Sequence, residues 1–254
     1  FHWCQEIRKV SKVPVIFRAT PQWFIKMDHS NYPLRQKCLN AAEKQIQYYP
    51  KWGAQRLNAM LANSPDWCLS RQRVWGVPVP VFYCEKCQAP LVDSEVMNKL
   101  ADVMEKTKEG IEAYFSHATS TFTAGKKCAC GNNSFITGKD ILDVWFDSGI
   151  CHTAVQKRRK ELEFPADIYL EGSDQHRGWF QTSLVSAMAA EDKTPFKALI
   201  THGFVNDAQG YKMSKSVGNT VDPEDIIKES GAEILRLWVS HEDYGQDLTI
   251  SKQM

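Results

Sequence analysis

The sequence predicts an α/β protein whose core is a parallel sheet. Residues 166–170 and 197–201 are apolar stretches typical of buried strands, and residues 175–190 between them have the pattern of a helix. A strand, a helix and a second strand in this order form a β-α-β unit, and the strands of such a unit run parallel. Ligands of parallel sheets bind beyond the carboxyl ends of the strands. The end of the first strand, at residues 171–174, is therefore the first candidate site.

Composition limits the class of protein. The chain has 254 residues, of which 43% are hydrophobic and 24% charged, as in ordinary globular proteins. Its net charge is +1, so any RNA would have to be bound by a local patch or by another part of a longer molecule. No apolar run approaches the length of a membrane span and no signal peptide is visible, so we expect no membrane partner. The chain begins with Phe1 rather than Met, which indicates a piece of a longer protein.

The N-terminal part of the chain has the pattern of the end of a domain that begins upstream. Residues 13–20 read as a strand, and residues 34–48 read as an amphipathic helix with apolar side chains at helical spacing. Trp52 and Gly53 are expected to break that helix, and a second, shorter helix follows at residues 54–62. We interpret the apolar stripes of both helices as core.

The next stretch combines arginine with tryptophan. Arg71 and Arg73 lie close in the chain to Trp67 and Trp75. A guanidinium group can bind phosphate and stack on an aromatic ring. It can equally stitch a buried turn by donating to backbone carbonyl groups. The spacing alone leaves both interpretations open, and we assign neither arginine a catalytic role.

Four cysteines, Cys84, Cys87, Cys128 and Cys130, bound an insertion. A C-x-x-C pair and a later C-x-C pair supply four thiolates, which suit a tetrahedral structural zinc site with no position left open for catalysis. Unligated thiols and redox chemistry are the alternatives. We favour zinc in a reducing cytoplasm, because turn residues flank each pair. A single helix is expected between the pairs, at residues 94–115.

Polar and aromatic side chains follow the first predicted strand. Glu171 and Asp174 are carboxylates that could accept hydrogen bonds from an ammonium group or a ribose hydroxyl, although Asp174 could simply cap the next helix. Trp179 lies one helical turn after Gln175 and could face the same pocket. Trp145 lies in a short apolar segment that ends in a polar turn, and could be core or pocket wall.

Residues 210–219 have the composition of a loop that closes over a polyphosphate. Lys212 and Lys215 lie three apart among Gly, Ser and Asn. Lysine is a compact cation on a flexible stem, and flanking glycines let the backbone approach a ligand closely. An ordinary solvated basic turn is the alternative, since short motifs often occur by chance. Beyond the loop, Asp222 is expected to cap a helix that Gly231 ends, and another helix follows.

Three of these strings resemble a known family. Lys-Met-Ser-Lys-Ser at 212–216 resembles the signature loop of the class I aminoacyl-tRNA synthetases. The strings at 140–149 and 170–180 are similar to the isoleucyl branch of that class. The resemblance implies the second half of a Rossmann-type parallel-sheet nucleotide-binding domain, with a small cysteine-rich zinc insertion and the start of a helical domain. The boundaries it implies are 1–66 for the edge of the editing insertion, 67–83 for the return into the catalytic domain, 84–131 for the zinc insertion, 132–221 for the catalytic half with the signature loop, and 222–254 for linker helices towards an anticodon-binding domain.

The resemblance also implies an activity and the residues that carry it. Enzymes of this branch join isoleucine to ATP, taken with Mg2+, and transfer the isoleucyl group to tRNA(Ile). A structural Zn2+, a cytoplasmic location and a monomeric full-length enzyme are implied as well. Editing is expected, because isoleucine and valine differ by a single methylene in an apolar pocket. The implied roles are catalysis for Lys212 and Lys215, ATP binding for Lys212, Ser214 and Lys215, and binding of the aminoacyl-adenylate for Trp145, Glu171, Asp174, Gln175 and Trp179, with the two tryptophans flanking the branched side chain.

Two other functions stay open. A paralogue that binds tRNA or nucleotide without catalysis would have no need of both the signature loop and the Glu171 pocket. A valyl or leucyl sister enzyme is expected to carry different residues at 173–180. The other signature of the class, His-x-Gly-His, does not occur in these residues. We therefore expect this chain alone not to charge tRNA.

Overall fold

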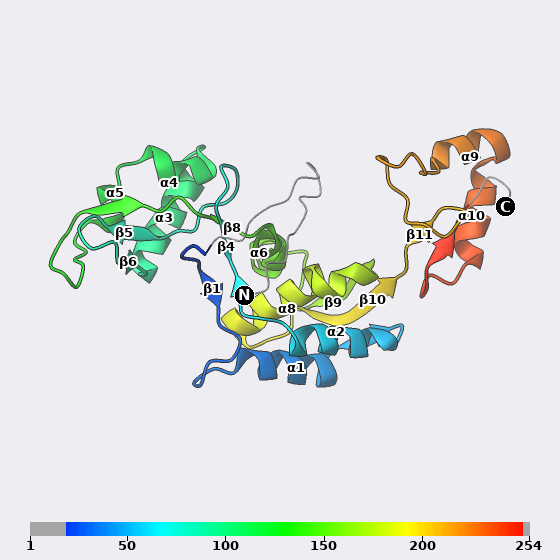
Figure 1. Cartoon of the computed structure of the whole chain (residues 1–254), viewed down its shortest axis with the longest axis horizontal. Coiled ribbons are helices and arrows are strands. Elements are labelled where there is room, and N and C mark those ends of the chain that lie inside the picture. The colour runs from blue at the N-terminus through cyan, green and yellow to red at the C-terminus, as the bar shows by residue number, and fades with distance from the viewer. Residues whose placement is uncertain (1–18, 251–254) are drawn as a thin grey trace.

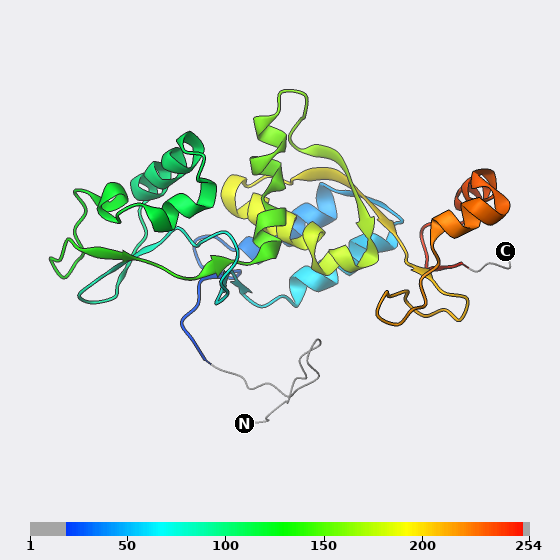
Figure 2. The same ribbon diagram turned by 90° about the horizontal axis from the view of Figure 1, so that it is seen from above.

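The computed structural model describes residues 19–250, so almost all of the strand expected at 13–20 lies outside the described residues. Figure 1 shows three parts along the long axis: a small lobe (green), a central α/β part, and a C-terminal part (orange to red). The view from above in Figure 2 shows the same separation. Within the described range, no helix combines the length and the apolar character needed to cross a membrane.

The central part is built on a three-stranded parallel sheet, which confirms the predicted fold class. Strand β10 (Phe196–His202) lies in the middle, between β9 (Ala166–Gly172) and β2 (Gln47–Tyr49). Both neighbours run parallel to it. Most side chains of β10 are buried, as expected for a strand that is covered on both faces. The two strands of the predicted β-α-β unit are therefore direct neighbours.

The edge strand β2 corrects the predicted helix at 34–48. Helix α1 (Leu34–Lys44) ends earlier, and the three residues of β2 pair with β10 instead of adding a last helical turn. Ile46 keeps the apolar spacing of the helix and is buried, so periodicity alone did not reveal the break. Tyr49 precedes Pro50, and a residue before proline is driven away from helical geometry. Residues 47–49 form a strand because they pair with β10, which is distant in sequence.

Two further helices complete the central core. Trp52 and Gly53 open helix α2 (Trp52–Ala62) instead of separating two helices. The helix predicted at 175–190 is divided into a short 3₁₀ turn, η3 (Ser173–Arg177), and helix α8 (Trp179–Glu191), with Gly178 between them. Fully buried side chains of α1, α2, α8 and β10 pack together around one core: Cys38, Leu57, Leu61, Phe180, Leu184, Phe196 and Leu199.

The small lobe has a core of its own, in which Phe82, Tyr114 and Phe122 are fully buried. Its antiparallel sheet has the order β6-β5-β7. The single helix expected at 94–115 is interrupted: it ends at Lys106, where Thr107 adopts an extended conformation, and Gly110, with a φ of +57°, opens the next turn. The elements of the lobe are β5 (Phe82–Cys84), β6 (Pro90–Leu91), α3 (Ser94–Lys106), η1 (Gly110–Glu112), α4 (Ala113–Ser116), α5 (Ser120–Thr123) and β7 (Phe135–Thr137).

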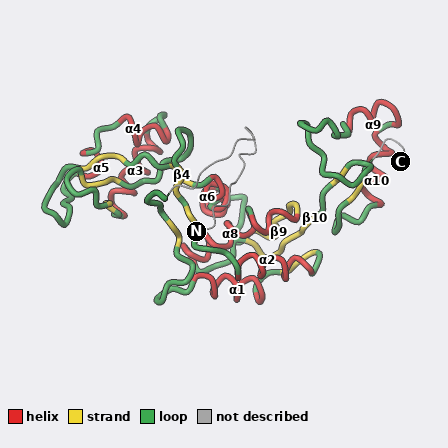
Figure 3. Tube along the Cα trace, in the orientation of Figure 1, coloured by secondary structure: helices red, strands yellow, loops and turns green. Residues whose placement is uncertain are grey.

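Short elements join the lobe to the central part, and Figure 3 shows how much of this joint is loop. Two antiparallel pairs, β1 with β3 and β4 with β8, bring the chain back to α6, which packs on α8. The bounds are β1 (Phe24–Ile25), β3 (Trp67–Cys68), β4 (Ser70–Arg71), β8 (Ile141–Leu142), α6 (Val144–Gly149), α7 (Cys151–Ala154) and the 3₁₀ turn η2 (Gln156–Arg158).

The C-terminal part follows β10 through Gly203. A Cβ on Gly203 would lie 2.1 Å from the carbonyl oxygen of Gln246, so only glycine permits this close approach of two backbones. The predicted caps are confirmed: Asp222 accepts a hydrogen bond from the N–H of Glu224, and Gly231 ends the helix with a φ of +86°. The elements are β11 (Val205–Asn206), α9 (Pro223–Ser230), α10 (Ala232–His241) and β12 (Leu248–Thr249), with β11 parallel to β12.

Candidate active site and metal centre

The carboxyl end of β9 gathers three of the predicted site residues. Glu171 is the next-to-last residue of this strand, and Asp174 and Gln175 lie in η3, which follows at once. Glu171 and Asp174 are exposed, and Gln175 is half-buried. The side-chain nitrogen of Gln175 donates to Oδ2 of Asp174 at 3.4 Å. The fold thus presents two carboxylates and an amide to solvent at the edge where parallel sheets bind ligands.

The amide of Gln175 also positions helix α8. Its Oε1 accepts a hydrogen bond of 2.9 Å from the backbone N–H of Trp179, the first residue of α8. The expectation that Asp174 could be a helix cap is wrong, because its side chain caps neither η3 nor α8. Gly172 and Gly178 occupy the two N-cap positions instead. Asp174 therefore keeps its carboxylate free of a capping role.

The two predicted tryptophans lie on adjacent helices. Trp145 is in α6 and is 41% exposed, with its ring edge against the backbone of Gly178. Trp179 stacks flat on Tyr169 of β9, with ring centroids 4.0 Å apart and planes 8° from parallel. Its Nε1 donates to the carbonyl oxygen of Ser148 at 3.0 Å. Both indoles therefore belong to the wall that α6 and the start of α8 form beside the end of β9.

Asp143 holds this wall in place, and our reading of the sequence did not single it out. Its carboxylate, only 7% exposed, lies 3.0 Å from a guanidinium nitrogen of Arg71 and accepts a hydrogen bond of 3.0 Å from Nε1 of Trp67. It also caps α6 by accepting from the N–H of Trp145. An Asp just before a helix is a cap signal that the sequence did contain.

The structure supports the turn interpretation of Arg71. Besides Asp143, this guanidinium donates to the carbonyl oxygens of Cys68 at 2.7 Å and Ser70 at 2.9 Å. Arg71 thus stitches a turn. A cavity of about 460 Å³ adjoins the same turn, with Arg71, Asp143, Trp145, Arg177 and Gln181 in its lining. Arg73 is exposed, and the structure gives it no such anchoring role.

The signature loop lies apart from this wall. Lys212 and Lys215 are exposed, and Figure 1 shows the segment between β11 and α9 in the C-terminal part, apart from α6. The ammonium of Lys212 lies 4.7 Å from the ring centre of Phe204, a cation–π contact. Ser214 donates from its backbone to the side chain of Asn219 at 2.9 Å. The structure therefore does not bring the two lysines against Trp145.

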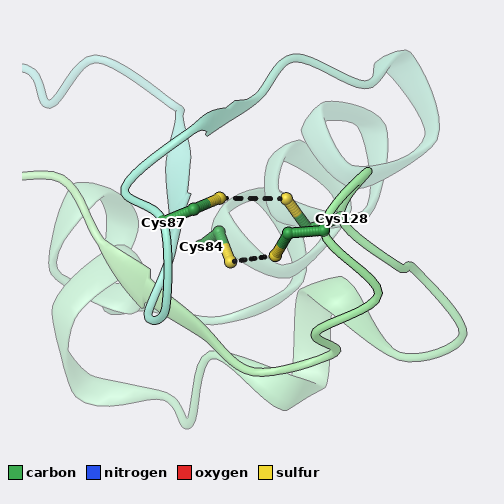
Figure 4. A group of neighbouring side chains, drawn as sticks. Cys84, Cys87 and Cys128 are labelled. Carbon is green, nitrogen blue, oxygen red and sulfur yellow. Dashed lines mark hydrogen bonds between the residues drawn. The ribbon is translucent and has the colours of Figure 1, made fainter.

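The four cysteines of the small lobe converge (Figure 4). Sγ of Cys87 lies 3.4 Å from Sγ of Cys128, Sγ of Cys84 lies 3.6 Å from Sγ of Cys130, and all four sulfurs lie within 4.8 Å of one another. Sulfurs bound at about 2.3 Å around a tetrahedral zinc would be about 3.8 Å apart. A disulfide requires about 2.05 Å. The spacing thus fits a tetrahedral metal centre and excludes two disulfides in this arrangement.

Two similar turns present these sulfurs. In the first turn the N–H of Gln88 donates to the carbonyl oxygen of Cys84, and in the second the N–H of Gly131 donates to that of Cys128. The side-chain N–H of Asn132 points at Sγ of Cys84 at 3.4 Å. This hydrogen bond, followed by backbone N–H donors, lowers the pKa of Cys84 to about 6. A thiolate stabilised in this way is the form that binds metal.

Comparison with known families now identifies the fold. The model of the family described as tRNA synthetases class I (I, L, M and V) matches residues 5–251. The chain belongs to the class I tRNA synthetases. Similarity to this class was expected from the signature loop, and the match extends it over nearly the whole chain.

Relatives within the class I tRNA synthetases are close. The chain is 51% identical over 245 residues to an isoleucine–tRNA ligase of Syntrophotalea carbinolica, and 51% identical over 252 residues to that of Desulfotalea psychrophila. An isoleucine–tRNA ligase of Aquifex aeolicus is 50% identical over 248 residues. These matches cover 96–99% of this chain but only 26% of each relative. The chain thus spans about a quarter of the length of these class I synthetases.

Solved structures agree on the fold. A methionyl-tRNA synthetase of Mycobacterium tuberculosis, bound by methionyl-adenylate, matches 98% of this chain and 40% of its own length. The TM-score is 0.60 at 18% sequence identity. At that identity the likeness concerns the fold alone.

Proposed function

We propose that the protein containing this chain is an enzyme that activates isoleucine with ATP and transfers the isoleucyl group to tRNA(Ile). The observation that carries this proposal is the identity of about 50% with isoleucine–tRNA ligases along 96–99% of the chain. Because the chain spans about a quarter of those relatives, the whole activity is assigned to the full-length gene product and not to this segment.

The first step would join the carboxylate of isoleucine to ATP. A carboxylate oxygen attacks the α-phosphorus, the bond from that phosphorus to the bridging oxygen of the β-phosphate breaks, and pyrophosphate leaves with the bonding electrons. In the second step a ribose hydroxyl at the tRNA 3′ end attacks the acyl carbonyl, and AMP leaves. Neither step needs a covalent bond to the protein. Catalysis would then be positioning and stabilisation of charge on the phosphates.

The lysines of the signature loop suit that task. Lys212 and Lys215 are exposed on a loop between two glycines with positive φ, Gly210 and Gly218. We assign to both lysines the stabilisation of the negative charge that develops on the leaving pyrophosphate of ATP, which enters with Mg2+. Ser214 belongs to the same loop and would contribute to ATP binding. Since the loop lies apart from α6, binding of ATP would require it to close over the site.

The end of β9 would hold the adenylate. Glu171 and Gln175 provide acceptors for the ammonium group and the ribose hydroxyls, and Asp174 adds charge to the polar end of the site. Trp145 and Trp179 would flank the branched side chain of isoleucine. Their places on α6 and α8, with Gly178 between them, support this assignment.

The cysteine centre would be structural. Zn2+, when bound by four thiolates, crosslinks the two turns and is left without an open coordination position. Residues Cys84, Cys87, Cys128 and Cys130 would hold it, and their sulfur spacing supports that assignment. The pairing of β5 with β7 suggests that this insertion continues to Thr137.

The test is amino-acid-dependent exchange of pyrophosphate into ATP by the purified full-length gene product. Isoleucine is expected to give the highest kcat/KM, and valine and leucine much lower values. A maximum with valine or leucine would instead indicate a sister enzyme. Absence of exchange with all three amino acids, in protein that binds ATP or tRNA, would favour a non-catalytic binding protein.

A further inference from the structure

Asp207 is a buried carboxylate directly after strand β11. It is 8% exposed, and its two oxygens accept three hydrogen bonds. Oδ1 accepts from the backbone N–H of Gln209 at 3.0 Å and from that of Tyr211 at 2.8 Å. Oδ2 accepts from the side-chain nitrogen of Asn219 at 2.8 Å. One side chain therefore fixes the chain just before the signature loop and a residue just after it.

Asn219 extends this connection into the loop itself. Its Oδ1 accepts from the N–H of Ser214 at 2.9 Å, and its Nδ2 also approaches the carbonyl oxygen of Lys212 at 3.3 Å. The two backbone contacts of Asn219 thus lie at the first and third residues of the Lys-Met-Ser-Lys-Ser string. A single amide therefore joins the loop to Asp207.

Charge strengthens the arrangement. The hydrogen bond from Asn219, followed by the backbone N–H of Tyr211, lowers the pKa of Asp207, so that the acceptor is a full carboxylate at neutral pH. Hydrogen bonds to an ionised acceptor are about twice as strong as neutral ones. Lys212 does not use this carboxylate, since its ammonium lies over the ring of Phe204. The cation therefore remains available to a ligand.

We propose that Asp207 and Asn219 are positioning residues that hold the backbone of the signature loop in one internal conformation, so that Lys212 and Lys215 are directed together at the triphosphate of ATP when the loop closes. This inference rests on the proposed function for its catalytic consequence. A lysine side chain loses rotamer entropy when it binds a ligand. A loop whose backbone is already ordered adds less to this entropy cost than a loop that must become ordered on binding. Neither Asp207 nor Asn219 needs to touch ATP for this role.

The polarity of the pair provides a sharp test. Asp207→Asn keeps the size of the side chain, but places an N–H group opposite the N–H of Asn219, so two donors meet. Asn219→Asp alone places two carboxylates opposite each other. The double variant with both changes restores one donor and one acceptor in reversed order. We call the hydrogen bonds of Asp207 and Asn219 the tether of the loop. Asp222→Asn is the matched control, because Asn caps a helix as well as Asp and Asp222 takes no part in the tether.

The experiment measures pyrophosphate exchange by the full-length gene product and, on the same proteins, the rate of tryptic cleavage after Lys212 and Lys215. Asp207→Asn is expected to lower kcat/KM for ATP at least about tenfold, since small misplacements of catalytic groups cost up to about 100-fold, with KM for isoleucine unchanged. Cleavage at the loop should become faster. The double variant should recover most of both effects, and Asp222→Asn should resemble the wild type.

The outcomes separate this inference from the proposed function. If the wild type shows no exchange with isoleucine but Asp207→Asn speeds loop cleavage and the double variant reverses it, the tether stands and the isoleucine assignment fails. If the wild type is active with isoleucine but Asp207→Asn changes neither the ATP kinetics nor the rate of cleavage, the proposed role of Asp207 is wrong and the proposed function stands. Asn219→Ala gives a second variant should Asp207→Asn not fold, with the same expected directions.

Discussion

The ring of Trp145 packs directly against the backbone of Gly178. A Cβ on Gly178 would lie 3.0 Å from two ring atoms of Trp145 and 2.6 Å from Oε1 of Gln175. A Cβ at this position would force the Gln175 amide to move and the Trp145 ring to shift, so the absence of a side chain at residue 178 permits the present close packing of α6 on the start of α8. The same glycine separates η3 from α8. One position therefore sets both the wall and the polar end of the candidate site.

Gly178→Ala is expected to damage the site. The added methyl group must displace the Trp145 ring or the Gln175 amide, and such overpacking costs about 1–3 kcal/mol. Chemical denaturation gives the loss in free energy of unfolding, and isoleucine binding by the full-length gene product should weaken. The double variant Gly178→Ala with Trp145→Ala relieves one of the two clashes. If the losses in free energy of unfolding of Gly178→Ala and of Trp145→Ala simply add in the double variant, the two residues are not coupled as described.

Lys215→Ala in the full-length gene product is expected to slow adenylate formation about 100-fold or more, as does the loss of one charge-stabilising donor in other enzymes. Isoleucine binding should change little, because the loop lies apart from α6, the helix that carries Trp145. Pre-steady-state formation of the adenylate and equilibrium binding of isoleucine separate the two effects. Lys228→Ala, an exposed lysine of α9, is the control and should behave as wild type. A dominant loss of isoleucine affinity would show that the assigned role is wrong.

The cysteine centre predicts one zinc ion per chain. Elemental analysis of the purified chain should give stoichiometric zinc, and Cys84→Ser should lose most of it, because one of four thiolates is removed. A strong chelator should loosen the small lobe, whose separate core contains Phe82, while the parallel sheet stays folded. Cys151→Ser lies outside the cluster and should retain the metal. Zinc-free wild-type protein with an intact lobe would contradict the assignment.

Two buried histidines predict a loss of stability in mild acid. His152 and His176 are about 1% and 0% exposed, and burial lowers the pKa of each below the ordinary 6.5. For His152, hydrogen bonding to Gly149 opposes the shift, and so does the charge of Glu191, whereas Lys157 adds to it. For His176, the Ser173 carbonyl opposes the shift. The unfolded chain takes up protons below pH 6.5 before the folded one does, so stability is full above pH 6.5 and falls as the pH drops towards the lowered pKa.

Urea denaturation at pH 7.5 and pH 5.5 measures this loss. His152→Gln should make the dependence on pH shallower, because one of the two titrating groups is removed. His241→Gln is the control, since that side chain is 88% exposed and should leave the dependence unchanged. Equal slopes in the wild type and in both His152→Gln and His176→Gln would exclude these histidines as the cause.

Much of the site could be predicted from the sequence because its signals are local. The strands at 166–170 and 197–201 are marked by apolar runs, the cap at Asp222 by its own side chain, and the cysteine pairs by their spacing. The fold class, which depends on the order of such segments, is confirmed. The gathering of Glu171, Asp174 and Gln175 also follows from local order, since all three come directly after one strand.

Other features depend on residues that are far apart in the chain, and the sequence pattern did not reveal them. Strand β2 exists because residues 47–49 meet β10, although their spacing continues that of a helix. Arg71 stitches a turn because Asp143 lies beside it in space. The predicted helix is divided at Gly178, whose backbone is not helical and against which Trp145 packs closely.

The sequence by itself determined which chemical groups the candidate sites contain: two loop lysines, two carboxylates after a strand, and four thiols. These depend only on residue type and order along the chain. The tertiary structure alone decided how the groups are held, through Asp143 under α6, Gly178 against Trp145, and Asp207 with Asn219 under the signature loop. The physical reason is that hydrogen bonds and close packing of this kind join side chains whose separation in sequence carries no periodic signal.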